Sequence, residues 1–272
     1  MLIDVNRYSS SLKKLWADVF GDSDDYIRLL FDCGYTPCEC FAEVSDSEVI
    51  SALYLLKGYI DNGNESYEGR YLYAAATAEN HRGKGLMAKL IKEAQNYVAS
   101  NNISFISLVP ANEGLYGYYS RFGFEAVMKN YIAVADGKSD AAIVKKTSPD
   151  KAYKIRRGID APCFRFADGE WKYAVSCLRY AGYEFIENTD SSYFLINDRG
   201  DEVLEYVSTS EDFNENIQAL LRRLGAVTQI VSPYDLSDCC ECKENRFGMV
   251  FFADEKMKNN LKGDIYMNIA LD

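Results

Sequence analysis

Apolar residues in the first half of the chain alternate between helical and strand-like spacing. Apolar positions three and four residues apart predict a helix over residues 10–20 that ends at Gly21. The acidic run at residues 22–25 is typical of a helix N-terminus and predicts a second helix directly after it. Three strands are predicted next, the last two joined by an Asn-Gly hairpin, at residues 40–44, 49–60 and 70–78.

The segment after these strands carries one clear apolar stripe. The stripe runs from residue 84 to residue 100 and predicts an amphipathic helix. A buried strand is predicted at 105–109, a short helix at 115–121, and a last hairpin that turns at 122–124 and returns through 131–135. The fold class predicted from this order is α/β (α+β), with a mixed, mostly antiparallel sheet flanked by helices.

The second half shows the same order of elements at an offset of roughly 130–140 residues, which predicts a tandem repeat of one fold. A polar, turn-rich stretch at 136–152 separates the halves, so we expect domains at 1–136 and 150–272. Helices are predicted in the second half at residues 150–157, 169–181 and 211–224. Strands are predicted there at residues 183–187, 193–197, 202–207, 227–231, 248–252 and 265–269.

The net charge narrows the choice of partners. The chain has 41 acidic residues against 30 lysines and arginines, a net charge of −11, and therefore repels nucleic acid. No apolar run approaches the roughly 20 residues that cross a bilayer, and no signal peptide is visible. We expect a cytoplasmic protein with no membrane or nucleic-acid partner. The acidic balance weakly favours cationic substrates such as polyamines, aminoglycosides or lysine-like groups.

Eight cysteines raise the question of a metal site. Cys239 and Cys242 have C-x-x-C spacing, but a zinc site needs four ligands. The only histidine is His81, and there is no second C-x-x-C pair. A second group, Cys33, Cys38 and Cys40, is the one alternative that could complete a site. In a reducing compartment we expect free thiols, and no metal site is predicted.

The segment from Asn80 to Met87 has the pattern of an anion site. A strand leads through a turn with two glycines into a helix N-terminus, where free amide groups and the helix dipole favour negative charge. Arg82 and Lys84 add positive charge at the same place. The matching segment of the second half, 208–211, reads Ser-Thr-Ser-Glu, an ordinary helix cap, so only the first half is expected to bind an anion.

Two motifs in residues 71–124 resemble the GCN5-related N-acetyltransferase (GNAT) superfamily. The acetyl-CoA motif Q/R-x-x-G-x-G/A is met at 80–85 by Asn-His-Arg-Gly-Lys-Gly, with Asn80 departing at the first position. The second motif, Y-x-x-x-G-F, is met from Tyr119 to Phe124. The resemblance implies a GNAT domain followed by a degenerate GNAT-like half.

This resemblance implies acetyl-CoA as the cosubstrate. The amides of residues 82–87 are expected to hold its pyrophosphate, and its pantetheine arm is expected to pair with the free edge of the preceding strand. Small side chains on that strand leave room for the arm. The expected cofactor-binding residues are Ala75, Ala76, Thr77, Arg82, Gly83, Lys84, Gly85, Leu86, Met87 and Asn112.

By the same resemblance Tyr119 is the catalytic residue, which donates a proton to the leaving thiolate. A strand amide near Ala75 is expected to hold the oxyanion. No general base is identifiable. The candidates, each of which also fits a surface or bystander role, are Glu68, Glu79, Glu113 and His81.

The function expected is acetyl-CoA-dependent N-acetylation of a primary amine on a small molecule or peptide. Two alternatives stay open: an acyl-CoA-binding module without turnover, and an aminoacyl or peptidyl transferase of the Fem type. The second half is expected to form a wall of the acceptor pocket, a dimer surface, or both, so a homodimer is an open alternative.

Overall fold

The computed structural model describes residues 1–32, 39–136, 145–209, 213–221, 227–261 and 263–271. Helices lie on both sides of a long, mixed sheet, and the predicted fold class is confirmed. The elements of the first half are β1 (Leu2–Ile3), α1 (Ser9–Phe20), α2 (Asp24–Asp32), β2 (Glu39–Ser45), β3 (Glu48–Asn62), β4 (Glu65–Thr77), α3 (Leu86–Ser100), β5 (Phe105–Leu108), α4 (Glu113–Ser120) and β6 (Glu125–Asp136).

The second half follows the predicted order with several additions. Its elements are α5 (Pro149–Arg156), β7 (Cys163–Phe166), α6 (Asp168–Tyr180), β8 (Glu184–Thr189), β9 (Ser192–Ile196), β10 (Glu202–Ser208), α7 (Phe213–Leu221), β11 (Val227–Ser232), β12 (Glu241–Phe252), α8 (Glu255–Asn260) and β13 (Ile265–Tyr266). The sequence did not predict β7 or α8. In each half, three antiparallel strands lead through a helix to a parallel strand, which is β5 after β4 and β11 after β10.

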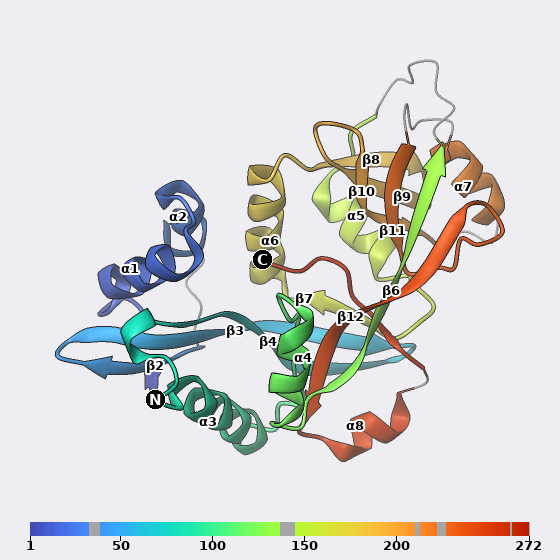
Figure 1. The fold of residues 1–272 in the computed structure, drawn as a ribbon. Coiled ribbons are helices and arrows are strands. Elements are labelled where there is room, and N and C mark those ends of the chain that lie inside the picture. The colour runs from blue at the N-terminus through green and yellow to red at the C-terminus, as the bar shows by residue number, and fades with distance from the viewer. Residues whose placement is uncertain (33–38, 137–144, 210–212, 222–226, 262, 272) are drawn as a thin grey trace.

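The two halves share strands within one continuous sheet. The strand order is β1-β2-β3-β4-β5-β12-β6-β11-β10-β9-β8, so β12 of the second half lies between β5 and β6 (Figure 1). The predicted hairpin over 122–135 is wrong, because β6 is one uninterrupted strand. It pairs with β12 along most of its length and with β11 at its end. Each parallel strand therefore has, as its second neighbour, a long strand from the other half.

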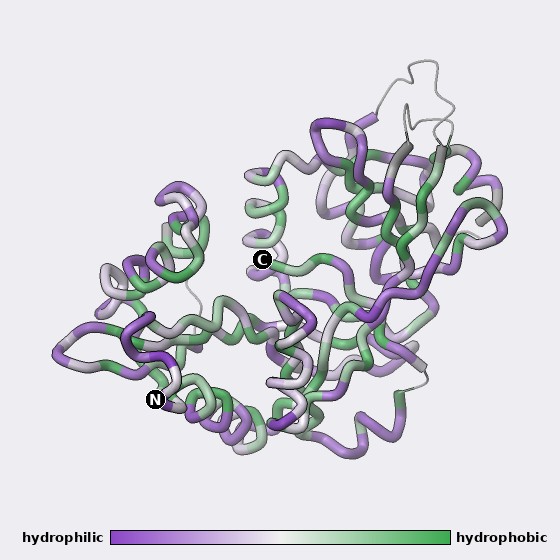
Figure 2. The backbone as a smooth tube through the Cα atoms, viewed as in Figure 1, coloured by the Kyte–Doolittle hydropathy of each residue, from purple (hydrophilic) through white to green (hydrophobic). Residues whose placement is uncertain are grey.

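Three apolar clusters fill the space around this sheet. One spans both halves and packs α1, α2 and α6 against one face, with Trp16, Tyr73 and Tyr173 among its members. The second lies between α3, α4 and the opposite face. The third joins the end of β6 to the strands and helix of the second half. Figure 2 shows mostly hydrophilic residues along α8, which lies at the outside of the fold. No helix in the described parts of the chain is long and apolar enough to span a membrane.

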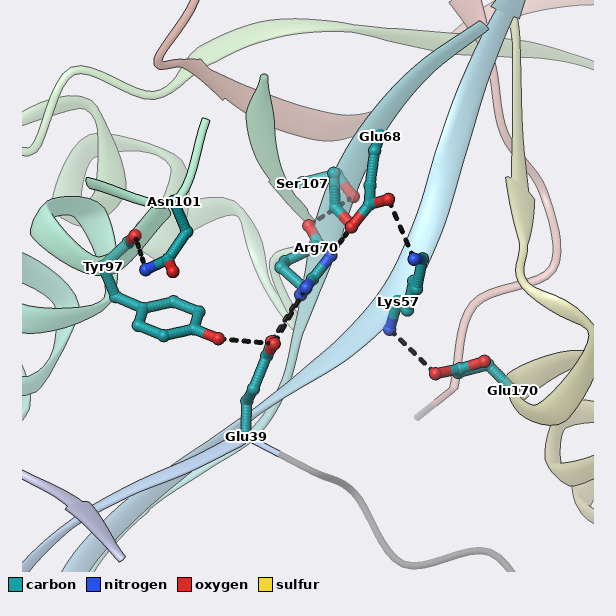
Figure 3. A network of polar contacts seen from close by, with 9 residues as sticks. Glu39, Lys57, Glu68, Arg70, Tyr97, Asn101, Ser107 and Glu170 are labelled. Carbon is teal, nitrogen blue, oxygen red and sulfur yellow. Dashed lines mark hydrogen bonds and ion pairs between the residues drawn. The ribbon is translucent and has the colours of Figure 1, made fainter. Parts of the chain in front are cut away.

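A buried ion pair fixes β4 close to where the parallel strand joins it. Arg70 is 7% exposed and binds the carboxylate of Glu39 on β2 through two nitrogens, while Tyr97 of α3 donates to the same carboxylate at 2.8 Å. Glu68 links Arg70 to Lys57, whose amide donates to Glu170 of α6 (Figure 3). The network therefore joins β2, β3, β4, α3 and α6.

Replacing Arg70 with Met is expected to lower the free energy of unfolding by about 3–5 kcal/mol, because it leaves the Glu39 carboxylate buried without its counter-ion. Urea unfolding followed by circular dichroism measures this change. Lys57→Met is the control: it removes a partly exposed pair, whose loss is expected to cost less than about 1 kcal/mol. Equal effects of the two substitutions would contradict this interpretation of the network.

Candidate functional site

The site lies where β4 and β5 separate. Their parallel pairing in the described residues runs only from Gly69 to Tyr71, opposite Phe105 to Ser107. Farther along β4, the register against β3 shifts between Tyr73 and Ala76, and Ala74 has a positive φ of 46°. This bulge inserts an extra residue and redirects the strand next to the gap. The β4 edge beyond Tyr71 is thus available to a ligand.

The predicted anion loop follows directly after β4. A short 3-10 turn (Glu79–His81) leads into it, and Gly83 and Gly85 have positive φ values of 74° and 77°. Gly85 is the residue before α3, so the helix begins at Leu86 and not at Lys84 as predicted. The amides of its first turn have no partners within the helix, and their N–H groups point outward from its N-terminal end. Arg82 is held beside them, since its Nε donates to the carbonyl of Thr77 at 3.1 Å.

A cavity of about 730 Å³, which we call the loop cavity, opens over these amides. Positively charged side chains at its wall include Arg82 and Arg121, and His81 lies beside them. Its lining residues are Val19, Ala75, Thr77, His81, Arg82, Gly83, Gly85, Leu86, Met87, Ala88, Leu115, Tyr118, Tyr119, Arg121 and Phe122. Cations and free amides around one cavity suit a ligand with phosphate groups.

A second cavity of about 550 Å³, which we call the aromatic cavity, meets the first. Its residues come from both faces of the sheet. They are Trp16, Phe20, Asp22, Tyr71, Leu72, Tyr73, Ala74, Ala75, Leu108, Val109, Pro110, Ala111, Leu115, Tyr119 and Leu271. The two cavities share Ala75, Leu115 and Tyr119, so a molecule in one can reach a molecule in the other at that point.

Tyr119 stands at this meeting point. It is 8% exposed and packs edge-on against Phe124 and Tyr118. Burial, with a smaller contribution from Tyr118, raises its pKa to about 12, so the phenol is neutral and keeps its proton at neutral pH. Its hydroxyl has no hydrogen-bond partner among the residues that the structure describes, and it is free to bond a ligand.

The helix that carries Tyr119 is attached to the second half. The hydroxyl of Tyr116 donates to the carbonyls of Arg246 and Phe247 on β12, at 3.1 and 3.0 Å. The guanidinium of Arg246 lies 4.0 Å from the centre of the Tyr116 ring and pairs with Glu113. Strand β12 therefore helps to position α4.

Most of the predicted cofactor-binding residues line the loop cavity. Three do not: Ala76 is buried on the other face of β4, and the side chains of Lys84 and Asn112 are exposed outside both cavities. Asn112 precedes α4 without capping it through its side chain.

Of the candidates for a general base, only His81 lines a cavity, and it lies on the phosphate side. The carboxylate of Glu68 forms ion pairs with Lys57 and Arg70, and the carboxylate of Glu113 forms one with Arg246. Glu79 is exposed at the start of the 3-10 turn.

Three residues that line the aromatic cavity were not predicted from the sequence as site residues. Trp16 and Phe20 read as one face of an amphipathic helix, and Asp22 reads as part of an acidic helix start. All three line the aromatic cavity. The one available signal was their proximity in sequence around Gly21, which is too general to indicate a site.

The cysteines within the described residues are free thiols. Burial, together with its neighbours Cys242 and Cys239, raises the pKa of Cys240 to about 11. No group of three or more metal-ligating side chains occurs in the described parts of the chain. Cys33 and Cys38 lie outside the described residues, as do residues 210 and 211 of the second half's predicted helix cap.

The region that contains the site resembles a known protein family. Residues 7–127 match the model of the acetyltransferase (GNAT) domain. By this match, the first half of the chain contains a GNAT domain. The matched region contains the loop cavity, Tyr119 and the gap between β4 and β5. No curated protein matches the chain in sequence.

Solved structures share this fold over nearly the whole chain. A probable N-acyltransferase from Enterococcus faecalis V583 superimposes with a TM-score of 0.72 at 13% identity, covering 93% of this chain and 72% of its own. Eis1 from Mycobacterium abscessus gives 0.70 at 11% identity, with coverages of 94% and 74%. A GCN5-related N-acetyltransferase from Kribbella flavida gives 0.67 at 16%, with coverages of 94% and 72%. At these identities the likeness concerns the fold alone.

Replacing Tyr116 with Phe is expected to lower the free energy of unfolding by about 1 kcal/mol, because it removes the hydrogen bonds from α4 to β12. Thermal or urea unfolding measures the loss. Tyr118→Phe is the matched control, since the Tyr118 hydroxyl makes no hydrogen bond to the described residues. An unaltered stability for the Tyr116 variant would mean that these bonds do not hold α4.

Proposed function

We propose that this GNAT domain is an acetyl-CoA-dependent N-acetyltransferase that acts on a primary amine. The observation that carries the proposal is the position of Tyr119 and Ala75, where a cavity suited to phosphates meets a cavity suited to an organic acceptor. A neutral phenol with a raised pKa stands at that junction. Acetyl transfer needs a proton donor between the two substrates, and this is where such a donor would have to lie.

The loop cavity fits the cofactor part of acetyl-CoA. The first-turn amides of α3 and the side chain of Arg82 would hold the pyrophosphate, and Arg121 also lines the cavity. The pantetheine arm would hydrogen-bond to the β4 edge near Ala75 and Thr77, which β5 leaves unpaired. Arg82 is already oriented by the Thr77 carbonyl, so little side-chain freedom would be lost on binding.

Acetyl-CoA would supply the thioester, and residues of this chain would assist its transfer. A bond forms between the amine nitrogen and the acetyl carbon, and the carbon–sulfur bond breaks. The Tyr119 phenol would donate its proton to the departing thiolate, and a backbone amide near Ala75 would hold the negative charge that develops on the carbonyl oxygen. The proton lost by the amine balances the proton that Tyr119 gives up.

Substituting Phe for Tyr119 is expected to reduce kcat about a hundredfold, because the thiolate then leaves without a proton donor. Release of free CoA with a panel of amines measures turnover. Calorimetric affinity for acetyl-CoA serves as the control and should change little, since the phenol donates to the leaving group. Unchanged turnover in this variant would remove Tyr119 from the reaction and favour a module that only binds acyl-CoA.

The pH dependence follows from the raised pKa of Tyr119. The proton-bearing form is the competent donor, and burial keeps it populated until the pH approaches 12. We therefore expect no decline of kcat on the alkaline side near pH 10, where an ordinary tyrosine would ionise. A kcat–pH profile tests this, and a fall centred near pH 10 would contradict it.

Gly85→Ala is expected to weaken CoA binding about tenfold. An alanine at this position, where φ is 77°, would strain the loop and displace the amides of α3. A Cβ at this position meets no atom within 4 Å, so the fold should persist. Gly200→Ala is the matched control: it has φ 74° and equal space, but lies in a turn of the second half. Calorimetry with CoA distinguishes them, and equal affinities would argue against a phosphate site here.

A further inference from the structure

The aromatic cavity limits what the acceptor can be. We propose that the acceptor carries a single positive charge on an apolar body, and that Asp22 recognises its ammonium group. This inference rests on the proposed acetyltransferase function, of which it specifies the acceptor. It departs from the polycationic amines that the net charge of the chain favours.

Asp22 is the only charged side chain among the fifteen described residues that line this cavity. It lies in the turn between α1 and α2 and is half-buried. A carboxylate beside apolar walls attracts a cation more strongly than one surrounded by water. One negative group in the lining matches one positive group on the ligand.

The carboxylate is held in place by its neighbour on α1. The indole Nε1 of Trp16 donates to Oδ2 of Asp22 at 2.7 Å, and Trp16 itself is 3% exposed. Trp16 is in turn packed edge-on against Tyr73 at a ring separation of 5.4 Å. The acceptor-binding carboxylate is therefore fixed by the core before any ligand arrives, which reduces the entropy lost on binding.

The remaining walls are aromatic and aliphatic. Phe20 is 44% exposed, unusually open for a large apolar residue, and lines the cavity with Trp16, Tyr71 and Tyr73. Such rings cover an apolar body and can also face a cation. A polyamine or aminoglycoside would bring further ammonium and hydroxyl groups against walls that offer them no counter-ion, and their lost hydration would oppose binding.

The test measures amine binding to the protein without acetyl-CoA, by calorimetry at neutral pH. The probes are 2-phenylethylamine, its neutral analogue 2-phenylethanol, and spermidine. We expect 2-phenylethylamine to bind about tenfold or more tightly than either of the others, because it alone combines the ring with a single charge. Asp22→Asn should weaken its binding about tenfold or more and leave 2-phenylethanol unaffected. The Asn carbonyl can still accept the Trp16 bond, which preserves the local fold.

The matched control is Asp18→Asn, which removes an identical charge from an exposed position on α1 outside the cavity. Its affinity for 2-phenylethylamine should equal that of the unmodified protein. Spermidine binding as tightly as 2-phenylethylamine, or equal losses in the two variants, would overturn the inference. Because no acetyl-CoA is present, these results are separate from turnover: failure of the proposed acetyltransferase function would appear instead as absent CoA release with amines that do bind.

Discussion

Backbone hydrogen bonding on the open sides of β5 and β11 is the constraint on which the rest of the structure depends. Each is a parallel strand with one neighbour from its own half, and buried strand edges need partners for their amide and carbonyl groups. Strand β12 satisfies β5, and β6 satisfies β11, while β6 and β12 pair with each other. The open side of each parallel strand is therefore covered by a strand of the other half, and the two halves also share one apolar cluster.

This exchange also builds the site. Strand β12 packs beside β5 at the point where β5 and β4 begin to diverge, and Phe251 lies against Phe124 just beyond α4. Through Tyr116, the same strand holds the helix that carries Tyr119. The second half further contributes Leu271 to the aromatic cavity. Its contribution to the proposed chemistry is therefore to position residues of the first half and to close one wall.

Each half buries one glutamate carboxylate that is paired with an arginine. In the first half, Arg70 and Glu39 form a buried ion pair. In the second half, the fully buried carboxylate of Glu205 pairs with Arg156 and accepts hydrogen bonds from Arg156, Tyr193 and Tyr266. Every oxygen of Glu205 has a donor, which offsets the cost of removing the carboxylate from water. Tyr266 comes from β13, so this carboxylate also fixes the C-terminal segment that leads to Leu271 and the aromatic cavity.

The sequence alone determined what depends on neighbouring residues. Helical periodicity, the Asn-Gly hairpin and the glycine turn before α3 each follow from local backbone preferences, so the loop of the candidate site and the spacing of Tyr119 from it were predictable. Partners distant in sequence were decided only by the tertiary structure. A strand pattern specifies which face of a strand is buried but not which strand lies beside it, so β6 was assigned to a hairpin when its neighbours are β12 and β11. For the same reason the sequence identified Asp22 only as part of a helix start. Asp22 lines a cavity because β4, α4 and the C-terminal segment, all distant in sequence, pack around it.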